Sequence, residues 1–178
     1  MDPLDPAAQL EALHRESFAW ALSCCGGRWA EAEDVLQTVY LHVLEEKARF
    51  GGQSSFKTWL FSVIRNRAAK EMRRQMVRRL FLQRQEEEPA PLPASPAPDA
   101  SLETAELQSA FERALEALPR RQREVLHLVF YEGLSLSEAA QVMAVSLGSA
   151  RQHYHRAKLK MREEFEPQME NLQHERRN

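Results

Sequence analysis

The stretch from Glu86 to Ser101 most limits what this chain can fold into. It reads EEEPAPLPASPAPDAS, with five prolines, a single leucine and no aromatic residue. Such a segment buries too little apolar surface to offset the conformational entropy lost on ordering, so it favours a semi-extended, disordered linker. We therefore expect one small domain before it, over residues 5–85, and another after it, over residues 102–166, with a polar tail at 167–178.

Both flanks of this linker show the spacing of amphipathic helices. A first helix is expected around Leu10–Leu22, ending at Gly26-Gly27. Apolar residues then recur at steps of three and four from Ala32 to Leu44, and a second such run, Phe56 to Ile64, follows a possible N-cap at Ser55. Helical spacing resumes from Leu102 to Leu118. The sequence predicts an all-α fold of two helical domains.

The second domain carries the signals of a helix-turn-helix. Ser135 and Glu138 form a capping box, and Ser146 is a good N-cap for a longer helix starting at Leu147. The helix before this pair should start at Pro119 and end at Gly133, burying Val125, Leu126, Val129 and Phe130. The longer helix would bury Ala150, Tyr154, Ala157 and Met161, which leaves Ser149, Arg151, Gln152, His155 and Arg156 on the opposite face. A helix of this kind fits the major groove of DNA.

Charge is distributed unevenly along the chain. The formal net charge of −2 divides into +3 for residues 1–84, −6 for residues 85–106 and +1 for residues 107–178. Residues 57–84 alone carry nine basic side chains and one acidic side chain. Residues 147–162 carry five basic side chains and no acidic one. A purely basic helix face and a cationic track with aromatic residues just before it both indicate nucleic acid, the latter in single-stranded form.

Other classes of function find little support in the residue types. Adjacent Cys24 and Cys25 make neither a disulfide framework nor a zinc site, and the pattern is typical of small buried side chains. His153 and His155 diverge on a helix, so the sequence predicts no metal, no cofactor and no enzyme. A signal peptide and a long apolar run are also lacking, which favours a cytoplasmic protein without membrane contact of its own.

Three blocks, in order, resemble the extracytoplasmic-function group of bacterial RNA polymerase sigma factors. The first is AEDVLQTVY at residues 32–40, similar to the polymerase-binding helix of that family. The second is SSFKTWL at residues 54–60 followed by Ile64-Arg65-Asn66 and Arg73-Arg74, similar to its promoter-melting segment. The third runs from Leu118-Pro119-Arg120 to SLGSAR at residues 146–151. Lys70 stands where many members have an acid, and Gln152 and His155 occupy base-facing positions that vary between members.

The resemblance implies an alternative sigma factor that binds core RNA polymerase and directs promoter-specific initiation. It implies polymerase contacts by Asp34, Gln37, Thr38 and Leu41. For the melted downstream promoter element it implies Phe50, Gly51, Gly52, Gln53, Ser54, Ser55, Trp59, Arg65, Asn66, Arg67, Lys70, Arg73 and Arg74. For the duplex upstream element it implies Ser149, Arg151, Gln152, His155, Arg156, Lys158 and Lys160. Members are usually held inactive by an anti-sigma factor, so such a partner is expected.

The alternative is a stand-alone helix-turn-helix regulator that binds duplex DNA without polymerase. It accounts for the second domain but leaves the loop and the basic track at residues 50–84 without a role.

Overall fold

The computed structural model describes residues 5–82, 113–115 and 117–175, and every regular element in those ranges is a helix. The N-terminal half comprises α1 (Pro6–Ala12), α2 (His14–Cys24), α3 (Trp29–Leu44) and α4 (Phe56–Leu82). The C-terminal half comprises α6 (Arg120–Leu126), the π-helical segment η1 (His127–Tyr131), α7 (Leu136–Met143) and α8 (Leu147–Glu175). The predicted all-α fold is confirmed. The predicted linker, and most of the helix predicted for residues 102–118, lie outside the described residues.

The N-terminal half is built on a core between α2, α3 and α4. The single helix predicted around Leu10–Leu22 is wrong, because the chain forms two helices that break at Leu13, whose backbone lies at φ −99°, ψ 7°. Trp20, fully buried, donates from Nε1 to the Phe61 carbonyl oxygen at 3.0 Å and so ties α2 to α4. Gly26 and Gly27 both have positive φ and end this helix pair, at the point where the sequence predicted an end.

The C-terminal half contains the predicted helix-turn-helix, α7 and α8. Both halves of the capping box are present: Glu138 N–H donates to Ser135 Oγ at 3.2 Å, and Ser135 N–H donates to Glu138 Oε2 at 2.9 Å. Ala144 in the left-handed conformation ends α7, and Ser146 Oγ accepts from the Ser149 amide to start α8. The helix continues to Glu175, so residues 167–175, which the sequence analysis assigned to a polar tail, are an extension of α8.

The π-helical segment η1 changes which residues the preceding helix buries. The α-helical spacing predicted that Val125, Leu126, Val129 and Phe130 would all face inward. Val125 and Leu126 do so, but Phe130 is 65% exposed. A π turn contains more residues than an α turn, so side chains after it are rotated away from the face that a regular helix would present. The prediction was therefore wrong for Phe130.

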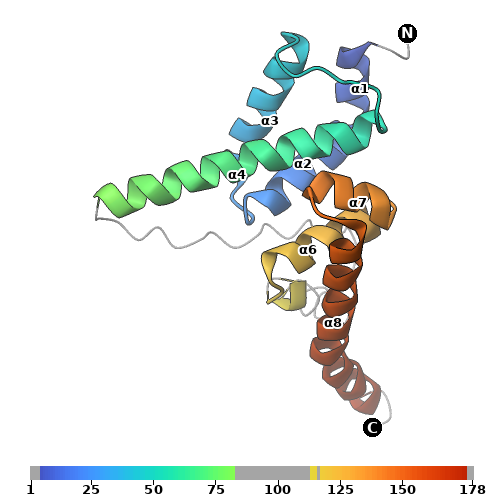
Figure 1. Ribbon diagram of the computed structural model, residues 1–178. Coiled ribbons are helices and arrows are strands. Elements are labelled where there is room, and N and C mark those ends of the chain that lie inside the picture. The colour runs from blue at the N-terminus through green and yellow to red at the C-terminus, as the bar shows by residue number, and fades with distance from the viewer. Residues whose placement is uncertain (1–4, 83–112, 116, 176–178) are drawn as a thin grey trace.

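The two halves pack against each other around one continuous core. In Figure 1 the long α4 crosses the molecule, with α1 and α3 above it and α6 and α7 below it, while α2 passes behind it. Leu128, Leu134, Ala139, Val142 and Met143 belong to the same buried cluster as the core of the N-terminal half. The far end of α8 extends away from this body.

Candidate nucleic-acid and polymerase interface

The outer face of α3 carries the four residues predicted to contact polymerase. Asp34, Gln37 and Leu41 are exposed, and Leu41 is 57% accessible although it is a large apolar side chain. Thr38 is half-buried, and its hydroxyl donates to the Asp34 carbonyl oxygen at 2.8 Å. The inner face of the same helix buries Val35 and Val39 and their neighbours. One rigid helix thus presents an acid, an amide and an apolar group together on its free side.

A groove of about 430 Å³ between α2 and α3 adjoins this face. Gln37 belongs to both surfaces, and the ring of Phe18 packs against that of Trp29 at a centroid distance of 4.4 Å. Trp29 is 55% exposed, so the groove adds an aromatic edge to the polar and apolar groups of α3.

The loop between α3 and α4 rests on a cluster of three aromatic rings. Phe50, Phe56 and Trp59 lie with ring centroids 5.3–5.6 Å apart. Phe50 is 40% exposed at the start of the loop, while Phe56 and Trp59 are half-buried on the first turns of α4. Ser55 Oγ accepts from the Thr58 amide at 3.1 Å, which confirms its predicted role as the cap of α4. The cluster fixes the base of the loop while leaving an aromatic edge accessible.

The loop lines an open cavity of about 630 Å³. Its lining includes Phe50, Gly51, Gln53, Ser54 and Trp59, all predicted site residues. Gly52, with φ +70°, supplies the left-handed backbone position that turns the loop, whereas Gly51 has no such requirement. An aromatic floor, hydroxyl and amide side chains and accessible backbone suit a flat, polar ligand such as a nucleobase. One further wall is Gln141, which belongs to α7 in the other half of the molecule.

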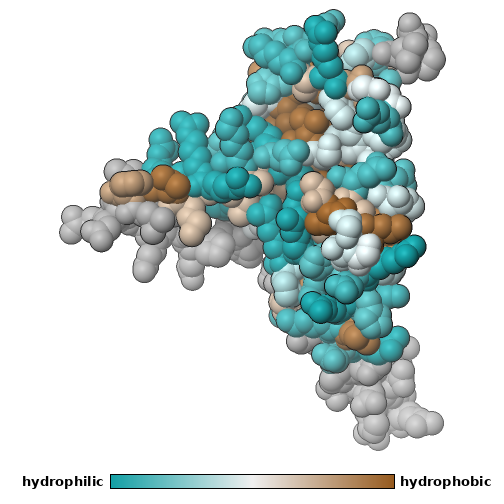
Figure 2. Space-filling view, viewed as in Figure 1, coloured by the Kyte–Doolittle hydropathy of each residue, from teal (hydrophilic) through white to brown (hydrophobic). Residues whose placement is uncertain are grey.

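The residues of α4 that were predicted to contact DNA differ in exposure, which a count of charges does not reveal. Asn66, Lys70, Arg73 and Arg74 are exposed, and they follow one side of the helix beyond Trp59. Figure 2 shows a mainly hydrophilic surface along this helix. Arg67 is half-buried and lies 3.8 Å from Glu71. Arg65 differs from all of these because it is only 7% exposed and faces the C-terminal half.

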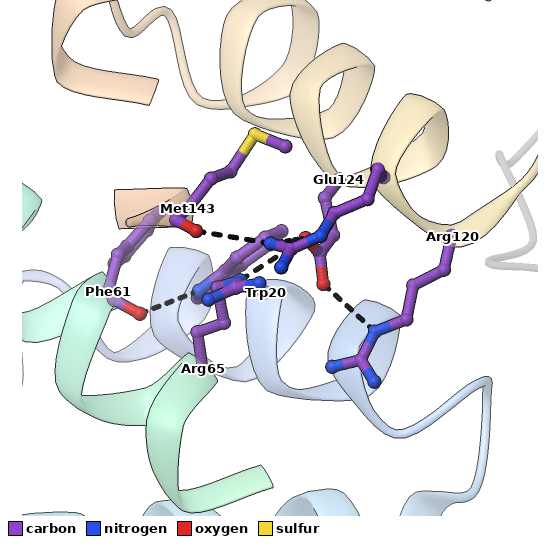
Figure 3. Close-up of polar contacts among 7 residues, drawn as sticks. Trp20, Phe61, Arg65, Arg120, Glu124 and Met143 are labelled. Carbon is purple, nitrogen blue, oxygen red and sulfur yellow. Dashed lines mark hydrogen bonds and ion pairs between the residues drawn. The ribbon is translucent and has the colours of Figure 1, made fainter. Parts of the chain in front are cut away.

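Arg65 is part of a buried ionic cluster centred on Glu124. Its Nε donates to Glu124 Oε2 at 3.2 Å, while Arg120 Nε donates to Oε1 at 2.9 Å and Arg121 Nη1 reaches Oε2 at 3.4 Å. Arg121 also donates to the Met143 carbonyl oxygen at 3.1 Å, which attaches α6 to the end of α7 (Figure 3). Three guanidinium groups on one carboxylate leave the cluster with excess positive charge. It borders a cleft of about 640 Å³ whose lining also includes Arg28 and Arg73.

The recognition face predicted on α8 is exposed. The accessible residues are Arg151, Gln152, His155, Arg156 and Lys158. Ser149 is half-buried, and its hydroxyl lies 2.9 Å from that of Ser146. On the opposite side Ala150 and Ala157 are fully buried.

Lys158 and Lys160 on α8 both have partners within the chain. The Lys158 ammonium lies 4.6 Å from the centre of the Tyr154 ring, and Lys160 Nζ donates to the Ala117 carbonyl oxygen at 2.8 Å. The structure therefore directs Lys160 towards its own domain, away from the exposed recognition face.

Comparison with known families assigns both halves. Residues 10–78 match the family model "Sigma-70 region 2", and residues 108–161 match "Sigma-70, region 4". The chain is 33% identical over 134 residues to the RNA polymerase sigma factor CarQ of Myxococcus xanthus, covering 75% of this chain and 74% of that protein. It is 31% identical over 151 residues to the ECF RNA polymerase sigma factor EcfG of Rhodopseudomonas palustris, covering 82% and 75%.

The chain belongs to the extracytoplasmic-function group of sigma-70 factors. It is an alternative sigma factor, a transcription initiation protein. A chain in the co-crystal structure of the sigma factor RpoE with the anti-sigma factor NepR from Bartonella quintana shares its fold, with a TM-score of 0.72, 24% identity and coverage of 90% of this chain and 96% of that one. Since region 2 is matched as well as region 4, the stand-alone helix-turn-helix regulator is set aside.

Three residues of this sigma factor that shape the site were not singled out from the sequence: Glu124, Glu132 and Gln141. Each acts across the two halves: Glu124 pairs with Arg65, the Glu132 carboxylate lies 3.0 Å from Lys57 Nζ on α4, and Gln141 lines the loop cavity. Pairing between distant segments leaves no local pattern in a sequence. An acid at position 124 among three arginines was the available signal, although on a helix it predicts only local ion pairs. Within the described ranges, no helix is long and apolar enough to cross a membrane, and no group of three or more His, Cys, Asp or Glu could hold a metal ion.

Proposed function

We propose that this sigma factor acts through three separate surfaces, one for core RNA polymerase and one for each promoter element. The observation that carries the proposal is that each set of residues lies together on one element and has an accessible face: α3, the loop with the outer side of α4, and α8. Because polymerase and chromosome share one compartment in bacteria, this function places the protein in the cytoplasm.

The α3 surface is proposed to bind core polymerase through Asp34, Gln37, Thr38 and Leu41. Replacing Asp34 by Arg and Gln37 by Ala changes exposed side chains only, so the helix content should remain while core binding weakens. Pull-down with purified core enzyme measures this, and Glu11→Arg, an exposed charge reversal on α1, is the matched control. Equal recovery of core by the double variant and the control would assign α3 a structural role alone.

The loop cavity is proposed to hold a base flipped out of the downstream element. Extruding a base costs a few kcal/mol, which stacking and a fitted pocket must return. Phe50 and Trp59 supply the aromatic surface, and Lys70, Arg73 and Arg74 lie along α4 where the strand's phosphates would run. Permanganate footprinting of holoenzyme on a promoter tests this. Asn66→Ala should reduce opening while closed-complex binding persists; unchanged opening would exclude Asn66 from the site.

The exposed face of α8 is proposed to read the upstream element in the major groove. Arg can bind guanine and Gln can bind adenine in a bidentate manner, and losing such a contact costs roughly 1–3 kcal/mol at one base pair. Arg151→Ala and Gln152→Ala should each relax preference at individual bases, whereas Lys158→Ala should weaken all sequences alike. In vitro transcription over a randomised upstream element tests the difference. Selection of the wild-type sequences by both variants would show that α8 is not the reader.

An anti-sigma factor is proposed as a regulatory partner. One solved chain of this fold is in complex with the anti-sigma factor NepR, and another, CnrH, is in complex with the cytosolic domain of CnrY. Purification from the native host under non-inducing conditions should yield a stoichiometric second protein, and a chain that purifies alone would contradict this.

A further inference from the structure

The cleft of about 640 Å³ beside the Glu124 cluster is lined by five arginines from three parts of the chain. They are Arg28 before α3, Arg65 and Arg73 on α4, and Arg120 and Arg121 on α6. None of the described residues that line the cleft is acidic. Glu124 is not part of the lining, and its side chain is only 4% exposed. The cleft therefore presents concentrated positive charge, which attracts anions.

Hydrogen bonds hold three of these arginines in place and leave donors available. Arg28 donates from Nε to the Cys25 carbonyl oxygen at 3.0 Å. Arg65 and Arg120 each use Nε for Glu124 (Figure 3). A guanidinium has five N–H donors, and no residue in the described ranges accepts from the terminal nitrogens of Arg65 or Arg120. Because the guanidinium groups are held beforehand, a ligand loses little binding energy to ordering them.

The spacing of the arginines favours a ligand that carries several negative charges. Arg65 and Arg73 are eight residues apart on α4, which corresponds to about 12 Å along the helix axis. Arg73 is exposed and has no ion pair within the described ranges, so its guanidinium is available. A single phosphate cannot bond both ends of such a row, whereas a chain of phosphates spans more of it. Guanidinium groups bind phosphate oxygens in a bidentate manner.

The same cleft also offers apolar surface and an amide. Met72 and Met76 of α4 line it, half-buried and 65% exposed respectively. The polarizable thioether of methionine makes favourable contacts with aromatic rings. Gln75, a further lining residue, accepts from Arg28 at 3.3 Å through Oε1, which leaves its amide nitrogen to donate to a ligand. This combination suits a nucleobase attached to the phosphates.

We propose that this cleft binds a free nucleoside oligophosphate, with its phosphates between the arginines of α4 and α6 and its base against Met72 and Met76. The site differs from the three surfaces proposed above, because Arg28, Arg120 and Arg121 belong to none of them. A DNA backbone offers the same phosphate chemistry. However, Lys70 and Arg74, which are proposed to follow the DNA strand along α4, do not line the cleft.

Isothermal titration calorimetry of the full-length protein with ATP tests the site. Salt at about 0.15 M screens long-range attraction, so binding then reports close contacts. Arg120→Ala should weaken ATP binding on the order of tenfold, because it removes charge-assisted hydrogen bonds to phosphate. Arg78→Ala is the matched control: Arg78 is exposed on the same long helix α4, carries the same charge and does not line the cleft, so its loss should leave the affinity nearly unchanged.

The same titrations can overturn the proposal. No binding of ATP by the wild type, or equal weakening by Arg120→Ala and Arg78→Ala, would show that the cleft is not a specific site. Arg121→Ala replaces Arg120→Ala as the test variant should the latter fail to fold by circular dichroism, since Arg121 lines the same cleft.

Two further probes identify the chemistry that the cleft accepts. Inorganic tripolyphosphate carries the phosphates without a base and should bind more weakly than ATP; affinity equal to that of ATP would overturn the contact between the base and the two methionines. A short fluorescein-labelled oligothymidylate reports on nucleic acid, and Arg120→Ala should bind it as tightly as Arg78→Ala does. If Arg120→Ala weakens binding of the oligothymidylate as much as that of ATP, the cleft holds a nucleic-acid backbone and the proposal of a free nucleotide is wrong.

Discussion

Removal of the Glu124 carboxylate is the most demanding test of the cluster that joins α4 to α6. Glu124→Ala leaves Arg65, with its side chain 8% exposed, without the carboxylate, whereas Arg120 and Arg121, 46% and 44% exposed, can turn to water. Removing one partner of a buried charge pair costs about 3–5 kcal/mol, because the remaining charge stays desolvated. We expect Glu124→Ala to lower the free energy of unfolding by an amount in this range, less whatever Arg65 recovers by reaching solvent.

Arg120→Ala provides the comparison within the same cluster. It removes a half-exposed partner and leaves Glu124 bonded to two arginines, so it should cost less than about 1 kcal/mol. Glu71→Ala, which breaks a single pair with Arg67 within α4, is the control for loss of a carboxylate and should cost a similarly small amount. Urea denaturation followed by circular dichroism measures all three. If Arg120→Ala costs as much as Glu124→Ala, or if Glu124→Ala is no worse than Glu71→Ala, Glu124 is not the centre of the cluster.

Three further predictions concern local features. Burial raises the pKa of Cys25 from 9.0 to about 11, so the stability that the neutral thiol contributes is complete below pH 9 and is lost as the pH rises towards 11, by up to about 2–3 kcal/mol. Between pH 8 and pH 10.5, denaturation should show a larger loss of stability for the wild type than for Cys25→Ala. Equal losses in the two proteins would contradict this prediction. Ser135→Ala removes the capping box of α7 and should cost about 1 kcal/mol, whereas an unchanged melting temperature would show that the cap contributes nothing. Gly52→Ala should lower the free energy of unfolding by about 1–2 kcal/mol because Gly52 has a φ of +70°. Gly51→Ala is the control, since a Cβ at Gly51 also meets open space, and it should cost far less. Equal costs for the two variants would refute the backbone explanation.

Local signals in the sequence were enough to predict where α4, α7 and α8 begin. Ser55, Ser135 and Ser146 each cap a helix as predicted, because a cap depends on residues only three positions apart. The break at Leu13 and the π turn after Leu126 were missed, since apolar spacing continues through both and tertiary packing decides the backbone there.

The site was predictable where exposure follows from helix periodicity. Asp34, Gln37 and the outward residues of α8 lie opposite buried stripes that the sequence already showed. Arg65 was grouped with the basic track because a charge count does not specify which side of α4 each residue occupies. Its true surroundings depend on Glu124, which lies 59 positions away in the chain. The docking of the two halves could not be inferred for the same reason.

The π turn at His127–Tyr131 limits the insertions and deletions that this part of the chain can tolerate during evolution. The π-helical segment connects α6 to the capping box of α7, and the Leu134 amide donates to the Leu128 carbonyl oxygen at 3.0 Å. Loss of a single codon here would rotate everything downstream by roughly 100° about the helix axis. Glu132 would then leave Lys57, and α7 would no longer meet α4. Insertions and deletions at this joint should therefore be purged by selection, whereas point substitutions at exposed Phe130 and Tyr131 can accumulate.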